Sequence, residues 1–170
     1  MDGGISKKLQ QLFPDAGPSR WITRERPKID RIACPWLVFR FIDPQAEFVY
    51  VPPDRVLAEA ERLNAECYDI PGVRFSHRGQ RCSFDAFIEE FELRDDALDV
   101  VATIVRGADT GALSLAPEAP GLLAVSLGLS RHFPDDQEML RAGLVIYDAL
   151  YAWARHARTE RHGWPPAMPQ

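Results

Sequence analysis

The sequence predicts an α+β fold, in the form of a predominantly α-helical single domain with a small β-sheet and a C-terminal αα-hairpin. The chain has 170 residues, of which 46% are hydrophobic, and this suits one domain with its own core. Several segments carry apolar residues at helical spacing, and the two longest are neighbours near the C-terminus. Between the earlier helical segments, short β-branched and aromatic runs predict two to four strands.

Bulk composition excludes several classes of protein. A net charge of -5 argues against a general nucleic-acid-binding surface. No run approaches 18 apolar residues, and the N-terminus has no apolar signal-peptide core, so we expect a cytoplasmic protein. Cys34, Cys67 and Cys82 are isolated and odd in number, which fits reduced thiols rather than a disulfide framework or a structural zinc site.

Residues 1–25 are interpreted as an N-terminal arm that precedes a domain over residues 26–157. The arm begins with a short helix, Ile5–Phe13, and proline and glycine residues then mark an irregular stretch. Arg20–Lys28 carries four basic residues around Trp21 and Ile22. Such a run is typical of a solvated surface, although it also suits contact with an anion.

The segment 29–42 is dense in aromatic and charged residues and contains Pro35. Because proline is tolerated at the first position of a helix, we expect a helix from Pro35 to about Ile42 with Cys34 at its N-cap. The helix dipole would lower the pKa of a thiol placed there. A longer helix that begins at Asp30 and is kinked at Pro35 is the alternative.

The middle of the chain alternates strands and helices. Strands are predicted over Glu47–Val51, Cys67–Ile70 and Val73–Ser76, and a helix over Arg55–Asn64. Ser83 is the expected N-cap of a further helix, whose apolar face consists of Phe84, Phe87, Ile88 and Phe91. Asp85 falls in the first turn of that helix, where the dipole favours a carboxylate.

The last part of the chain is the most regular. A helix is predicted over Asp96–Val105 with Gly107 as its stop, so Asp109 is expected at a loop edge. Gly121–Phe133 and Gln137–Arg155 form the predicted hairpin. Residues 158–170 are expected to be a disordered, proline-rich tail, and His156 and His162 near it are weak metal candidates.

One polar stretch, Phe75–Asp85, joins a predicted strand to a predicted helix and contains His77 at a loop edge. A histidine in that position builds no core, so it is the leading candidate for a ligand. Metal sites draw histidine, carboxylate and thiolate donors from several elements. The predicted metal ligands are His77, Asp109, Asp30, Asp148 and Cys82, and a site of this kind suits manganese, iron or zinc.

Four arginines offer an alternative site for an oxyanion, because the guanidinium fork matches the oxygens of such a group. They are Arg31, Arg78, Arg81 and Arg106. Salt bridges with nearby acids are the competing interpretation for each. Cys34 and Cys82 are predicted to be redox-sensitive if they lie near that site.

A resemblance to a known family is carried by five segments, namely Arg26–Leu37, Phe75–Phe87, Ile104–Gly111, Gly121–Ser130 and Gly143–Trp153. They resemble the C-terminal domain of the chromate-resistance ChrB family. The resemblance implies a bacterial stress-response protein, since family members act as chromate-sensitive regulators of a resistance operon. Longer members carry a further N-terminal region, and its near absence here favours a stand-alone ligand- or metal-binding module.

The residues and the resemblance together predict a metal- or oxyanion-binding protein involved in chromate resistance or sensing. A metal-dependent redox or hydrolytic enzyme that uses the same histidine and carboxylates is the first alternative. A chromate-responsive transcriptional regulator is the second, for which Arg20–Arg31 supplies the only basic element. The expected ligand is a metal ion or chromate, with no nucleotide cofactor, nucleic acid or membrane. A homodimer through the terminal hairpin is left open.

Overall fold

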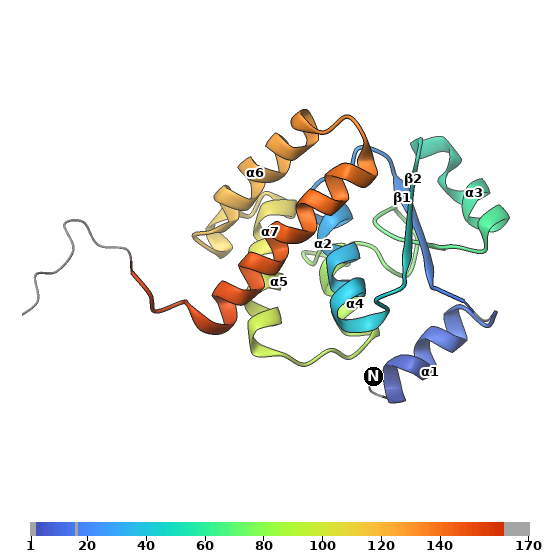
Figure 1. Ribbon diagram of the computed structural model, residues 1–170, viewed down its shortest axis with the longest axis horizontal. Coiled ribbons are helices and arrows are strands. Elements are labelled where there is room, and N and C mark those ends of the chain that lie inside the picture. The colour runs from blue at the N-terminus through green and yellow to red at the C-terminus, as the bar shows by residue number, and fades with distance from the viewer. Residues whose placement is uncertain (1–2, 16, 162–170) are drawn as a thin grey trace, which may run out of the picture.

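The computed structural model describes residues 3–15 and 17–161, which form a helix-rich α+β domain (Figure 1). This confirms the predicted fold class. The elements in chain order are α1 (Gly3–Leu12), β1 (Arg20–Arg24), α2 (Asp30–Leu37), the π-helical turn η1 (Val38–Ile42), β2 (Glu47–Val51), the 3₁₀ turn η2 (Pro53–Arg55), α3 (Val56–Leu63), β3 (Glu66–Cys67), α4 (Ser83–Glu90), α5 (Asp96–Thr110), the 3₁₀ turn η3 (Leu113–Leu115), α6 (Ala119–His132) and α7 (Asp136–His156).

The sheet is parallel and its strand order is β2-β1-β3, with β1 in the centre. Figure 1 shows α3 on one side of the strands and α2, α4, α5, α6 and α7 on the other. Successive residues of β1 serve the two sides, because side chains alternate along a strand. Trp21 joins the main core, and Ile22 joins a second cluster with Val56 and Ala60 of α3.

The interpretation of residues 20–24 as a solvated surface run is wrong. Trp21, Ile22 and Thr23 are fully buried, as expected for a central strand covered on both faces. Only the basic residues at the strand ends reach solvent, where Arg20 pairs with Glu47 and Arg24 with Asp69. Because basic residues stand at both ends of this strand, the sequence resembled that of a surface segment.

Helix α2 begins at Asp30, so the longer of the two predicted helices is correct and Cys34 is not an N-cap. Pro35 lies inside the helix and has no N–H to donate to the carbonyl of Arg31, four residues earlier. Two tyrosine hydroxyls donate to that carbonyl instead, from Tyr50 at 2.8 Å and Tyr68 at 3.2 Å. These hydrogen bonds let the chain keep helical geometry through the proline.

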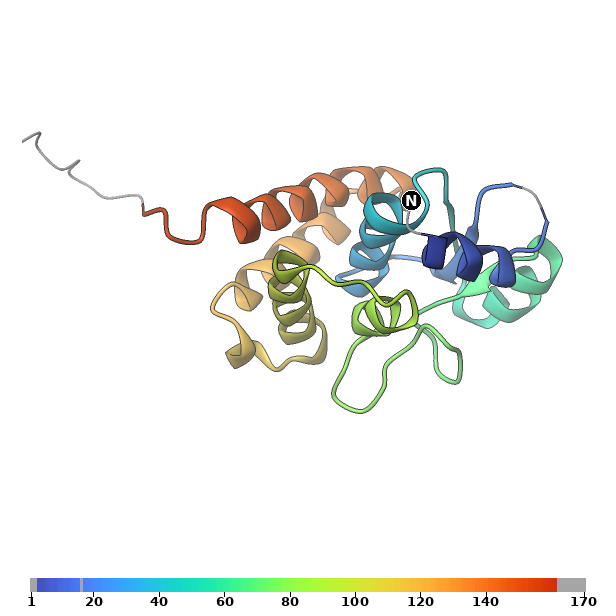
Figure 2. The same cartoon turned by 90° about the horizontal axis from the view of Figure 1, so that it is seen from below.

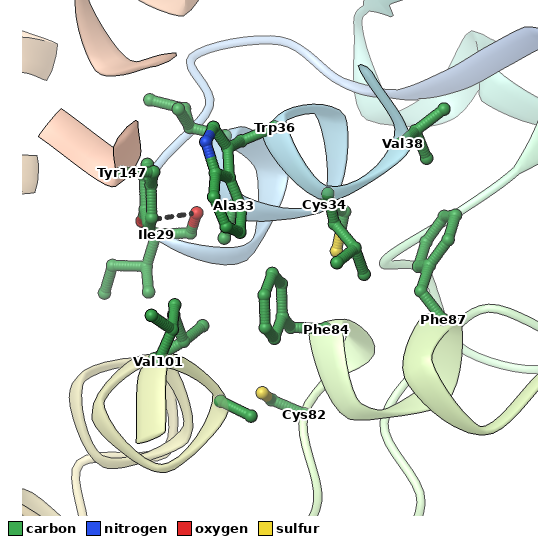
Figure 3. Close-up of a cluster of buried hydrophobic side chains, with 14 of the residues drawn as sticks. Ile29, Ala33, Cys34, Trp36, Val38, Cys82, Phe84, Phe87, Val101 and Tyr147 are labelled. Atoms are coloured by element: carbon green, nitrogen blue, oxygen red, sulfur yellow. Dashed lines mark hydrogen bonds between the residues drawn. The ribbon is translucent and has the colours of Figure 1, made fainter. Parts of the chain in front are cut away.

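Helix α2 is also the centre of the core. It packs against α7 and α4, and Figure 3 shows Trp36 and Cys34 among the buried side chains around Phe84. The α2–α7 crossing depends on Gly143, because a Cβ atom there would lie 2.5 Å from Cγ2 of Ile32.

Two helix ends differ from the prediction. Cys82, not Ser83, is the N-cap of α4, and its N–H donates to the Asp85 carboxylate in a capping box. Helix α5 continues through Gly107 to Thr110 and ends at Gly111, whose φ is 75°. A glycine is needed at position 107 because α6 approaches closely there, and a Cβ atom would lie 2.9 Å from Cβ of Ala119. Since the helix continues past Gly107, Asp109 lies in its last turn rather than in a loop.

The strands after α3 are shorter than predicted. Only Glu66 and Cys67 form β3, and the expected strand over Val73–Ser76 is reduced to a single bridge between Tyr68 and Phe75. Asp69 has a φ of 52°, which turns the chain out of the strand. The chain between β3 and α4 therefore loops out on one side of the molecule (Figure 2).

The terminal hairpin is confirmed within two residues at each helix end. Asp135 caps α7 by accepting the N–H of Glu138. The predicted tail beyond residue 161, with His162, lies outside the described residues. Among the described helices, none combines the length and the apolar character that crossing a membrane requires.

Candidate metal site

Three carboxylates converge on His77 from separate segments of the chain. The Nε2 atom of His77 lies 3.0 Å from Asp109 Oδ2, 3.4 Å from Asp69 Oδ1 and 3.6 Å from Asp30 Oδ2. One ligand atom each from Asp30, Asp69 and His77 can be enclosed within 4.8 Å of one another. This is a donor set of oxygens and one nitrogen, as many transition-metal sites have. We call these four residues the acidic cluster.

The strand order explains why the acidic cluster forms. After β1 the chain crosses to β2 on one side and then returns to β3 on the other. Such a reversal leaves a crevice at the carboxyl ends of the two diverging strands, where ligands bind in open α/β sheets. Asp30 follows β1 and Asp69 follows β3, so both carboxylates lie at this crevice. Asp109 from the end of α5 and His77 from the loop before α4 complete the cluster.

Asp30 is fully buried, and its Oδ1 atom has no hydrogen-bond partner within the described residues. The side chains of Asp69 and Asp109 are 10% and 16% exposed, and that of His77 is 42% exposed. A buried carboxylate oxygen without a partner is costly, and such groups call for a specific explanation. A cation bound among these carboxylates would provide one.

Neighbouring groups hold the carboxylates in place. The N–H of Ser83 donates to Asp30 Oδ2 at 2.6 Å, and the hydroxyl of the same serine donates to Asp69 Oδ1 at 2.8 Å. Arg24 and Arg31 lie 3.0 Å and 3.3 Å from Asp69 Oδ2. Metal ligands are commonly oriented by partners of this kind, which fix the carboxylate before the ion arrives.

Burial raises the pKa of Asp30 well above its ordinary value, and the negative charges of Asp109 and Asp69 raise it further. Burial and the charge of Asp69 also raise the pKa of Asp109, which His77 partly opposes. Asp30 and Asp109 therefore resist ionisation when no cation is present. A metal ion would reverse this, because carboxylates bind metals in their charged form.

The backbone immediately before Asp30 is strained. Ile29 has φ 40° and ψ -98°, which is rare for a β-branched residue. The hydroxyl of Tyr147, from α7, donates to the Ile29 carbonyl at 3.1 Å (Figure 3). Strain of this kind costs about 1–3 kcal/mol and gathers at functional sites. Here the strained residue directly precedes Asp30, so it belongs to the backbone that carries this carboxylate.

The structure brings together three of the five predicted metal ligands, namely Asp30, His77 and Asp109. Asp148 is bound elsewhere, by Arg40 at 2.7 and 2.8 Å and by the indole N–H of Trp36 at 2.8 Å. The hydrogen bonds from Arg40 lower the pKa of Asp148.

Cys82 is fully buried as the cap of α4, its Sγ lies 3.4 Å from Asp85 Oδ2, and burial raises its pKa. Cys34 is also fully buried, with a pKa that burial raises. Neither environment favours the thiolate, which is the form that reacts with oxidants.

Asp69 was missed by the sequence analysis. The only signal in the sequence is its place near the end of the short strand predicted over Cys67–Ile70, just before Pro71-Gly72. Nothing in that pattern says that the strand neighbours β1, so the approach of Asp69 to Asp30 had no local signature.

All four predicted oxyanion-binding arginines make ion pairs with acids, as the competing interpretation expected. Arg31 pairs with Asp69, Arg106 with Asp85, Arg81 with Glu89, and Arg78 with Glu89 and Glu90. Most of the positive charge of these arginines is therefore neutralised by carboxylates of the same chain.

A cleft of about 700 Å³ opens beside the acidic cluster. His77 is the member of the acidic cluster that also lines the cleft, so the two adjoin through its imidazole. The residues that line it are His77, Gly79, Gln80, Arg81, Arg106, Thr110, Ala112 and Leu115.

Comparisons with known proteins agree on one family. The family model described as ChrB, C-terminal domain, matches residues 21–154, a range that contains all four residues of the acidic cluster. Protein ChrB of Cupriavidus metallidurans is 34% identical over 150 residues, which cover 87% of this chain and 45% of that protein. The chain thus spans about half the length of this curated relative. No solved structure matches the chain.

Proposed function

This chain belongs to the family of ChrB C-terminal domains, and we propose that it binds a divalent metal ion as part of a chromate-resistance system. Chromate resistance is the role that the family resemblance implies. The metal is the part that the geometry supports. The observation that carries it is the unpartnered, fully buried oxygen of Asp30 among two further carboxylates and a histidine.

The donor set narrows the identity of the metal. Carboxylate oxygens with one imidazole favour manganese or ferrous iron, and zinc also accepts such ligands. No member of the acidic cluster is a thiol, and burial raises the pKa of the nearby Cys34 and Cys82 thiols, which argues against a soft metal such as copper(I). Manganese(II) is therefore the first ion to test.

The test is metal analysis of the purified protein, followed by titration of the metal-free protein with Mn²⁺ and detection of free Mn²⁺ by electron paramagnetic resonance. We expect one site, and we expect His77→Ala to weaken it by at least about tenfold, as the loss of one ligand or supporting group does. His132→Ala, which removes an exposed histidine of α6, is the matched control and leaves the affinity unchanged. Absence of saturable binding of Mn²⁺, Fe²⁺ and Zn²⁺ would rule the proposal out.

A metal-dependent enzyme is the second candidate, and the cleft beside His77 is the observation that favours it. Catalytic metal sites keep a position open to substrate, whereas structural sites are closed by protein ligands. Water exchange at the bound ion distinguishes the two. Proton relaxation of the Mn²⁺-loaded protein should show at least one exchangeable water if the site is open, and none if it is closed.

Direct capture of chromate by arginine, and DNA binding through Arg20–Arg31, have weaker support. The four candidate arginines are already paired, and within Arg20–Arg31 the side chains of Arg20, Arg24, Arg26 and Arg31 all make internal ion pairs. Without a bound metal ion to supply net positive charge, a guanidinium that already neutralises an internal acid adds little attraction for an anion or a phosphate backbone.

A further inference from the structure

We infer that the cleft beside the acidic cluster binds a small organic anion, a carboxylate with a short apolar chain, whose charged group also binds the metal. This inference rests on the proposed metal site. It concerns the cleft wall formed by Gln80, Arg81, Arg106 and Leu115, which the metal site itself does not use.

The charge of the site favours an anion once a metal is bound. Three carboxylates and the two guanidinium groups that face Asp69 give a net charge of -1, taken as three negative and two positive charges with His77 neutral. A divalent ion changes this to +1. A partly buried positive centre at the end of a cleft attracts negative ligands, because the low-dielectric surroundings screen it weakly.

The residues of the cleft wall also favour an anion. No carboxylate is among the residues that line the cleft, but two guanidinium groups are. Arg106 binds Asp85 through Nε and Nη2, and Arg81 binds Glu89 through Nη1. Within the described residues, the remaining nitrogens of both groups make no hydrogen bond. Each arginine therefore keeps donors for a ligand, since a guanidinium carries five N–H groups.

The loop that carries Gln80 has a defined shape. Arg78 and Arg81 exchange two backbone hydrogen bonds of 3.0 Å, and Gly79 between them has a φ of 62°. A tight turn with glycine at positive φ holds the next residue in place. The turn thus fixes the backbone of Gln80 at the cleft edge, and its exposed side chain is a polar group beside the cleft.

Size and apolar surface argue for an organic ligand rather than a bare inorganic anion. A cleft of about 700 Å³ lies within the range that metabolite-sized ligands occupy, roughly 300–1,000 Å³. Leu115 is 46% exposed and Ala112 is also exposed on the same wall. An apolar chain lying against them would bury surface that otherwise stays in water.

The experiment uses protein loaded with Co²⁺, whose visible absorption reports changes at the metal. Acetate, butyrate and benzoate are titrated in, with inorganic sulfate, n-butanol and n-butylamine as comparison probes. We expect saturable spectral changes with the carboxylates, tighter binding of butyrate and benzoate than of acetate, and no saturation with the alcohol or the amine. Metal-free protein, measured by titration calorimetry because it lacks the Co²⁺ absorption, should bind the same carboxylates at least about tenfold more weakly, the effect of losing one interaction with a charged group.

Two variants locate the ligand. Arg81→Gln should weaken butyrate binding about tenfold by removing a charge-assisted hydrogen bond. Leu115→Gln should reduce the preference for butyrate over acetate. Arg55→Gln and Leu57→Gln remove an exposed arginine and an exposed leucine of the α3 region and serve as matched controls without effect. All four variants should bind Co²⁺ normally.

The outcomes separate the two proposals. Loss of Co²⁺ binding altogether would overturn the metal site, and this inference with it. Normal Co²⁺ binding without saturation by any carboxylate would overturn only the inference. Sulfate binding as tight as that of butyrate, unchanged in Leu115→Gln, would show an inorganic oxyanion site and likewise contradict it.

Discussion

Asp30 and Asp109 lie in surroundings that disfavour their ionised forms. Burial and mutual repulsion raise the pKa of both carboxyl groups, and Ile29 is strained directly before Asp30. Each feature lowers the stability of the metal-free protein. Functional sites commonly carry such costs, so the residues that break local rules are the ones that point to the site.

Asp109→Asn should stabilise the metal-free protein near neutral pH by about 1 kcal/mol. A carboxyl group whose pKa is raised on folding takes up a proton as the chain folds. The free-energy cost of keeping Asp109 in the folded protein is therefore absent below the pKa of the unfolded chain. It grows as pH rises from that value to the raised pKa of the folded state. The stabilisation should vanish at about pH 3, below the ordinary aspartate pKa of 3.8.

Urea denaturation at neutral and acid pH measures this difference. Asp99→Asn, an exposed position on the same helix, is the control and should bring no gain. A metal-free Asp109→Asn protein that is less stable than the parent at pH 7 would contradict the electrostatic account of the acidic cluster.

Tyr147→Phe should weaken Mn²⁺ binding about tenfold, because supporting groups around metal ligands have effects of that size. The substitution removes the hydroxyl that holds the Ile29 carbonyl, and so releases the strained backbone that directs Asp30. The loss in stability should be about 1 kcal/mol, the contribution of one hydrogen bond.

Tyr151→Phe is the control for this positioning role. It removes a hydroxyl of the same helix that binds Asp95, away from the acidic cluster. We expect a similar loss of stability and no change in the Mn²⁺ dissociation constant. Equal effects of both substitutions on metal affinity would mean that Tyr147 acts only through general stability.

At the scale of elements, a helix was predictable where apolar residues form a stripe along the face that it packs against the core. The ends of α6 and α7 were predicted within two residues, because the apolar residues of both helices recur at helical spacing in the sequence. The strand β1 was missed, since a five-residue strand with basic residues at both ends has little pattern. Its burial comes from neighbours on both sides, which are distant in the chain.

Gly143→Ala should destabilise the protein by about 1–3 kcal/mol, the usual cost of overpacking a core. The added Cβ would meet Ile32 Cγ2 at 2.5 Å, and a β-branched side chain in a helix has little freedom to move. Gly128→Ala in α6, where a Cβ would meet nothing within 4 Å, should stabilise by about 0.5–1 kcal/mol through helix propensity.

Thermal and urea denaturation of the two variants measure the contrast. The two substitutions add the same methyl group to neighbouring helices, so they differ only in what the methyl group meets. A neutral Gly143→Ala would show that α2 and α7 can separate without cost, and the close crossing would then not hold α2 in place.

At the scale of the whole molecule, the acidic cluster ties together the ends of β1 and β3, the loop before α4 and the end of α5. A metal ion bound there joins segments from residue 30 to residue 109. Because the unfolded chain cannot offer these ligands together, binding and folding are coupled.

Mn²⁺ at about 100 times its dissociation constant should therefore stabilise the fold by about 2.7 kcal/mol. For a chain of this size that corresponds to a rise in Tm of about 5–10 °C. Scanning calorimetry with and without Mn²⁺ measures it, and His77→Ala should abolish most of the rise. A rise in Tm that His77→Ala leaves unchanged would place the ion outside the acidic cluster.

The sequence by itself determined the fold class, the helices of the final third, the family, and three members of the acidic cluster: Asp30, His77 and Asp109. The fold class and the helices follow from local periodicity, the family from the resemblance of five segments, and the three ligand candidates from polar residues beside the predicted apolar faces. Only the tertiary structure decided that Asp69 joins them, that Asp148 is bound to Arg40 instead, and that the four arginines are paired with acids. The reason is physical: a ligand set is defined by distances through space, and the strand order that brings residues 30 and 69 together leaves no local mark on either segment.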